Sequence, residues 1–157
     1  MAKSENTETR TMSRDGWISV MALSKRSDLD DIWNAIESKP DFRWIRKPEF
    51  GTVMARARAD QGGSQFNFGD VSVTRCSLET ADGQMGIAYV VGRDKRHAAL
   101  AAILDACLQR ADLKHSLFDE IAKLWEALSA RRQAKLARAY ATRVEFSETA
   151  EPRPNGQ

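Results

Sequence analysis

Residues 66–109 read FNFGDVSVTRCSLETADGQMGIAYVVGRDKRHAALAAILDACLQ and contain the pattern that decides the fold. Two runs rich in β-branched and aromatic residues flank Asp82-Gly83, a dipeptide typical of tight hairpin turns. The second run passes through Gly92-Arg93-Asp94-Lys95 into a segment rich in alanine and leucine at helical spacing. The stretch therefore predicts two antiparallel strands followed directly by a helix, with Asp94 as its N-cap.

The flanking segments extend this sheet and add helices at both ends. Alternating side chains predict two earlier strands, about residues 42–47 and 52–58, with Pro48 to Gly51 as the turn between them. Helical spacing predicts helices over about Asp15–Leu23, from a cap at Ser27 or Asp28 to Pro40, from Asp94 to about Ala111, and along two apolar stripes beyond Leu113. We therefore predict the α+β class, an antiparallel four-stranded sheet with two N-terminal helices and a C-terminal helical segment.

The last two strands, about residues 71–80 and 84–91, have distinctive features. The apolar residues change from even to odd positions here, which predicts a bulge or a bend at Gly69-Asp70. The last strand has a bulky face formed by Met85, Ile87, Tyr89 and Val91. Its opposite face, which we call the thin face, carries the small residues Gly86 and Ala88, which allow close approach by another element or another chain.

Length and composition favour one globular domain. The chain has 157 residues, of which 42% are hydrophobic and 29% are charged. We expect a flexible tail over 1–13, a single domain over 14–147, a mobile loop at Gln61 to Ser64 and a second flexible tail over 148–157. Cys76 and Cys107 are interpreted as two inert buried thiols, with a single disulfide bridge as the alternative.

Several classes of protein are disfavoured. The net charge of +2 is too small to indicate binding to nucleic acid or an anionic membrane. No segment approaches the roughly 18 apolar residues of a membrane span. The start, MAKSENTETRTMSR, lacks the apolar core of a secretory signal, so we expect a cytoplasmic protein.

The junction between the last strand and the following helix holds three candidates for anion binding: Arg93, Lys95 and His97. Unpaired N–H groups and the helix dipole favour an anion at this end. Two cations here oppose the dipole, which favours a compensating substrate anion or partner carboxylate, with solvated side chains as the alternative. His97 is either a phosphate ligand or proton-transfer group, or a helical histidine without a catalytic role.

Arg75 is the fourth candidate and lies in mid-strand among apolar neighbours. A charge there needs a partner, so we expect it to reach Asp70, Glu79, another subunit or a substrate anion. No nucleophile–base set or metal-ligand spacing is visible, so the catalytic residues are left unassigned and no metal is expected.

The last helical stripe carries a basic face formed by Arg131, Arg132, Lys135, Arg138 and Arg143. We interpret this face as solvated or as an interface, with contact to nucleic acid as the alternative. Four tryptophans occupy apolar stripes and are interpreted as core or interface anchors: Trp17, Trp33, Trp44 and Trp125.

A series of short motifs carries a resemblance to a known family. They are Gly69-Asp70, Thr74-Arg75, Asp82-Gly83, Gly86, Gly92 to Lys95, His97-Ala98 and Asp105-Ala106. Their order and spacing resemble the PhnG family, the G subunit of the bacterial carbon–phosphorus lyase system. The resemblance covers about Arg14 to Phe146, from the opening helix around Trp17 to the closing segment from Arg143.

The resemblance implies an accessory subunit of the carbon–phosphorus lyase core complex, with PhnH, PhnI and PhnJ as partners and the ATPase-like PhnL as a further one. With PhnH, PhnI and PhnL, the family is associated with attaching a phosphonate to C1′ of the ribose of ATP. Adenine leaves, and ribose 1-methylphosphonate 5-triphosphate is formed. Nucleosidase chemistry is ascribed to PhnI and carbon–phosphorus cleavage to PhnJ.

The resemblance further implies a chain with no cofactor of its own, in a transferase complex whose substrate is ATP. Displacement at an anomeric carbon with anionic reactants needs cations, which a subunit can supply at an interface. Our substrate-binding candidates are therefore Arg75, Arg93, Lys95 and His97. The alternatives are a scaffold for PhnI that touches no substrate, and a small nucleic-acid-binding domain.

Overall fold

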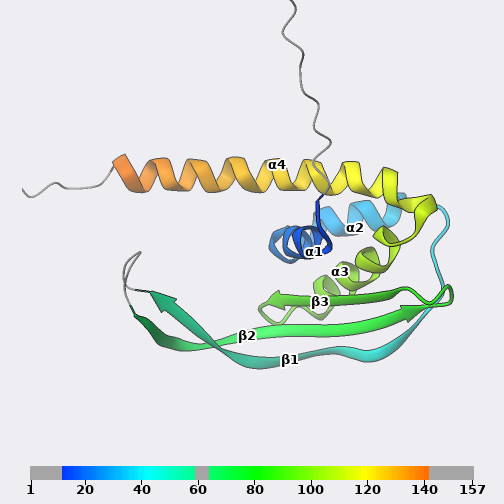
Figure 1. Ribbon diagram of the computed structural model, residues 1–157, viewed down its shortest axis with the longest axis horizontal. Coiled ribbons are helices and arrows are strands. Elements are labelled where there is room, and N and C mark those ends of the chain that lie inside the picture. The colour runs from blue at the N-terminus through cyan, green and yellow to red at the C-terminus, as the bar shows by residue number, and fades with distance from the viewer. Residues whose placement is uncertain (1–11, 59–63, 142–157) are drawn as a thin grey trace, which may run out of the picture.

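The computed structural model describes residues 12–58 and 64–141 and has the α+β architecture. Its elements are α1 (Arg14–Leu23), α2 (Arg26–Ala35), β1 (Phe42–Arg58), β2 (Gln65–Thr80), β3 (Met85–Val91), α3 (Lys95–Leu108) and α4 (Ala111–Ala141). The strands form one antiparallel sheet in the order β1-β2-β3, and all four helices lie on one side of it (Figure 1).

Parts of the predicted tails and loop lie outside the described residues. These parts are residues 1–11, 61–63 and 148–157, together with the closing segment from Arg143. Ser13, predicted to belong to the N-terminal tail, instead caps α1, because its side chain accepts a hydrogen bond from the Gly16 N–H at 3.2 Å.

The described residues form three strands, so the prediction of four was wrong. Residues 48–51, predicted as a turn, lie inside the 17-residue strand β1. The register of β1 against β2 shifts between Trp44 and Arg46 and again between Arg46 and Glu49. Because β1 is an edge strand with irregular pairing at this point, Pro48 is accommodated without a turn even though it has no N–H to donate.

The hairpin and the bulge that the sequence predicted are both present. Gly83 has φ of 82° and donates its N–H to the Thr80 carbonyl at 2.9 Å. Ala55 pairs with Gly69 and the next residue of β1 pairs with Asn67, which leaves Phe68 as the extra residue of a bulge. The bulge therefore lies one position before the predicted Gly69-Asp70.

The thin face of β3 is covered by α3 of the same chain. A Cβ built on Gly86 would lie 1.9 Å from the Ala102 carbonyl oxygen, so the helix backbone rests directly on the strand. Residues of α3 from Ala98 to Leu108 are almost all buried. The sequence predicted that another element or another chain would cover this face, and in the structure it is covered by an element of the same chain, α3.

The other side of the sheet is uncovered in the described chain. We call it the open sheet face, and on β3 it consists of Met85, Ile87, Tyr89 and Val91. Their exposed fractions range from 37% for Ile87 to 70% for Val91. The bulky side of this strand, rather than its thin side, is therefore the one available to a partner.

The helices differ from prediction mainly at their ends. The N-cap of α2 is Lys25, and Ser27 and Asp28 lie inside the helix, so the predicted caps were wrong. Asp28 instead occupies the first turn, where a carboxylate complements the helix dipole. The two C-terminal stripes belong to one 31-residue helix, α4, whose later half extends beyond the other three helices (Figure 1).

The close approach of α3 to Gly86 predicts a large effect of one methyl group. We expect Gly86→Ala to lower the free energy of unfolding by about 1–3 kcal/mol or more, because α3 must move off the strand. Gly51→Ala is the matched control, since nothing lies within 4 Å of the added Cβ in β1. Urea denaturation of the two variants measures the difference, and equal stabilities would contradict the packing described here.

Candidate functional site

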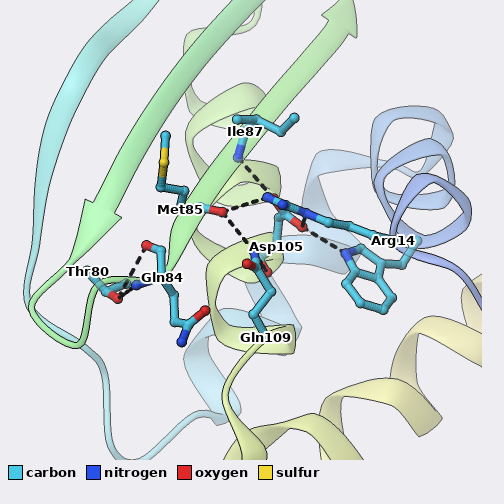
Figure 2. Close-up of polar contacts among 8 residues, drawn as sticks. Arg14, Thr80, Gln84, Met85, Ile87, Asp105 and Gln109 are labelled. Carbon is cyan, nitrogen blue, oxygen red and sulfur yellow. Dashed lines mark hydrogen bonds and ion pairs between the residues drawn. The ribbon is translucent and has the colours of Figure 1, made fainter.

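Asp105 is the most highly connected polar residue of the described core. It lies in the middle of α3 and is 0% exposed. Its Oδ1 accepts hydrogen bonds from Trp17 Nε1 at 2.8 Å and Arg14 Nε at 3.1 Å. Its Oδ2 accepts from Arg14 Nη2 at 2.7 Å and from the Ile87 backbone N–H at 3.0 Å (Figure 2). One carboxylate therefore joins α1, α3 and β3.

The same cluster closes part of the outer edge of β3. The Met85 carbonyl accepts hydrogen bonds from Arg14 Nη2 at 2.6 Å and from Gln109 Nε2 at 2.7 Å (Figure 2). The hydrogen bond to Asp105 raises the pKa of the Arg14 guanidinium. Because four donors occupy the Asp105 carboxylate, the cluster is a structural clamp at a sheet edge.

Sequence reasoning did not identify Asp105 as important beyond its place in the PhnG-like motif series. One local signal was available, a carboxylate in the middle of an alanine- and leucine-rich helix face. Such a charge is buried only when it is paired, so the pattern itself indicates a buried ion pair.

The start of α3 brings two of the four candidate residues together. Asp94 is its N-cap, as predicted, and accepts the His97 N–H at 3.0 Å, a bond that lowers the pKa of the Asp94 carboxyl. Arg93 Cζ and Lys95 Nζ lie 5.2 and 5.7 Å from the centre of the Phe50 ring. Neither cation forms an ion pair with a described residue.

The other two candidates lie elsewhere. His97 is buried, and its Nε2 donates to the Met21 carbonyl oxygen at 2.9 Å, because a carbonyl can only accept. Arg75 points to the open sheet face, where its Nε contacts Glu49 Oε1 at 3.1 Å. Glu49 was not among the partners that we considered for Arg75, because it was assigned to a turn. Of the four candidate residues, only Arg93 and Lys95 therefore lie together in a cationic cluster, beside the Phe50 ring.

The remaining reactive groups of the described core are inert. Cys76 and Cys107 are free and buried, as interpreted from the sequence, and burial raises the pKa of each thiol to about 11. No three His, Cys, Asp or Glu side chains within residues 12–58 and 64–141 are grouped as metal ligands. Among these residues, no helix has the length and apolar character of a membrane span.

Comparison with known proteins places this fold in a family. Residues 12–149 match the family described as phosphonate metabolism protein PhnG. The chain belongs to the PhnG family. It is also 34% identical over 148 residues to the "Alpha-D-ribose 1-methylphosphonate 5-triphosphate synthase subunit PhnG" of Rhizobium meliloti strain 1021, and the alignment covers 92% of each chain.

This result confirms the family suggested by the short motifs. Several of them have structural roles in this PhnG chain. Gly86 permits contact with α3, Asp82-Gly83 forms the hairpin turn, and Asp105 anchors the buried cluster. The name of the relative identifies it as one subunit of a synthase made of several chains.

The clamp predicts a specific loss of stability. We expect Asp105→Asn to lower the free energy of unfolding by roughly 3–5 kcal/mol, because Arg14 loses its buried partner and an amide N–H₂ faces other donors. Asp112→Asn breaks a solvent-exposed pair with Arg110 and is expected to have a much smaller effect. Thermal and urea unfolding measure both, and a cost for Asp105→Asn no larger than for Asp112→Asn would contradict the assignment.

Proposed function

We propose that this chain is an accessory subunit of a ribose 1-methylphosphonate 5-triphosphate synthase. Acting with PhnH, PhnI and PhnL, it takes part in joining an alkylphosphonate to C1′ of the ribose of ATP, with release of adenine. The observation that carries the proposal is the 34% identity, over 92% of both chains, to a relative named as a subunit of that synthase. We place this transferase complex in the cytoplasm, with PhnJ as a further partner.

The chain contributes no cofactor in this proposal, and ATP is a substrate of the complex. The described residues contain no buried nucleophile beside a general base, and the buried Asp105 and His97 are engaged in structural hydrogen bonds. We infer that the chain alone does not release adenine from ATP, and that the reactive groups come from another subunit.

The cluster of Arg93 and Lys95 is our proposed contact with substrate. Both side chains are exposed, without a carboxylate partner among the described residues, beside the N-terminus of the 14-residue helix α3. A triphosphate or phosphonate supplies the missing negative charge. The cluster would thus form one wall of an anion pocket completed by a neighbouring subunit.

A scaffold role is the second candidate, and the open sheet face favours it. Met85, Ile87, Tyr89 and Val91 are exposed side by side on β3, and a contiguous apolar patch of this kind is typical of a protein–protein contact surface. In this alternative the face binds PhnI, and Arg93 and Lys95 have no role in substrate binding. The nucleic-acid alternative has less support, because the net charge of the whole chain is only +2.

Reconstitution distinguishes the two roles. We expect adenine release from ATP and methylphosphonate by the assembled subunits, and none when this chain is omitted or tested alone. Arg93→Ala with Lys95→Ala should assemble normally but lose at least about tenfold in adenine release, because a charge-assisted contact is worth roughly 1.5–3 kcal/mol. Lys47→Ala with Lys114→Ala is the control, since it removes two exposed charges outside this cluster.

Each other outcome has a defined meaning. Failure of the Arg93/Lys95 variant to assemble would favour a carboxylate on a partner and hence the scaffold role. Normal assembly with full activity would exclude the cluster from the substrate site. Full activity of the subunit mixture without this chain would contradict the proposed function itself.

A further inference from the structure

A groove runs between α2 and the first half of α4. Its volume is about 760 Å³, and its floor is apolar, with Ile32, Ile36 and Leu117. Its lining carries four carboxylates and one ammonium group: Asp28, Asp31, Glu37, Glu120 and Lys123. Lys123 is bonded to Glu120 at 2.6 Å, so the groove presents an excess of negative charge above an apolar floor.

The second half of α4 has the opposite character. From Ala130 to Ala141 every residue is exposed, and this half extends beyond the other three helices (Figure 1). Arg131, Arg132 and Lys135 make no ion pair with a described residue. A long basic helical segment thus projects from the same chain that carries an acidic groove.

The groove and the basic segment share one face of α4. Positions 113, 117, 120, 124, 128, 131 and 135 follow one another at intervals of three or four residues, which is the spacing of a single helix face. The first four of these positions line the groove. Arg131 and Lys135 therefore continue the line of Leu117, Glu120 and Leu124 along the helix.

We propose that the chain self-associates through this face, with α4 of one copy antiparallel to α4 of the second. In a two-fold arrangement each copy places its basic half in the acidic groove of the other. Pairing centred near residue 126 brings Arg131 of one copy beside Glu120 of the other, and Lys135 beside Leu117. The 31 residues of α4 span ~46 Å, and the basic half from Arg131 to Ala141 supplies about three turns to lie on the partner.

The chemistry of the two halves supports a second copy as the occupant. Charges of opposite sign meet on both sides of the two-fold axis, and the stems of Arg131 and Lys135 supply apolar area for the groove floor. Ala127 lies one turn before Arg131 and Ala134 lies between Arg132 and Lys135, and their small side chains allow the helices to approach closely. This association does not depend on the proposed synthase role.

Analytical ultracentrifugation of the full chain and two charge-reversed variants tests the proposal. We expect a dimer for the natural chain whose dissociation constant rises with salt. One variant, Arg131→Glu with Lys135→Glu, has an acidic tail. The other, Asp31→Lys with Glu120→Lys, has a basic groove. All four positions are exposed on helices, and circular dichroism verifies that both variants fold.

Each variant alone should dimerise at least about tenfold more weakly, because like charges then meet at both ends of the helix pair. An equal mixture should dimerise like the natural chain, because every acidic tail then meets a basic groove and every basic tail an acidic groove. A natural chain that stays monomeric, variants that dimerise normally, or a mixture that stays monomeric would each overturn the proposal. Loss of binding to a different subunit by the tail variant, with no self-association of the natural chain, would identify that subunit as the occupant instead.

Discussion

The buried carboxylate of Asp105 is the constraint on which the rest of the domain depends. A charge in the middle of an apolar helix is tolerated only when its hydrogen-bonding capacity is filled. Arg14 and Trp17 from α1 and the Ile87 N–H from β3 fill it. The first helix is therefore required to assemble with β3 and α3, although it lies far from both in the sequence. Within the described residues no buried polar side-chain atom lacks a partner.

This arrangement determines which surfaces are left for function. Once α3 rests on Gly86, the thin side of β3 is filled and all helices lie on one side of the sheet. The open sheet face, the cationic cluster of Arg93 and Lys95 with Phe50, and the basic half of α4 then remain exposed. In the proposed role as a synthase subunit, these are the surfaces that other chains and an anionic substrate would contact.

Features encoded by neighbouring residues were predictable from the sequence, whereas those that depend on distant contacts were not. The Asp82-Gly83 turn and the Asp94 cap are local, and both were predicted correctly. Pro48 to Gly51 was interpreted as a turn because local propensity does not reveal an irregular edge strand. The same error concealed Glu49 as the partner of Arg75. The contacts of Asp105 with Arg14 and Trp17 cross 91 and 88 positions in sequence, and no pattern within one segment specifies them.

Hydrogen exchange at the Ile87 amide tests the central claim most directly. An edge-strand amide that faces solvent usually exchanges by local opening, whereas one bonded to a buried carboxylate is released only when the surrounding elements separate. We predict that the Ile87 amide exchanges with the same free energy as core amides of α3, such as that of Leu104. If the Ile87 amide exchanged by local fraying, with an opening free energy several kcal/mol below that of global unfolding, the result would contradict the account in which Asp105 holds these elements together.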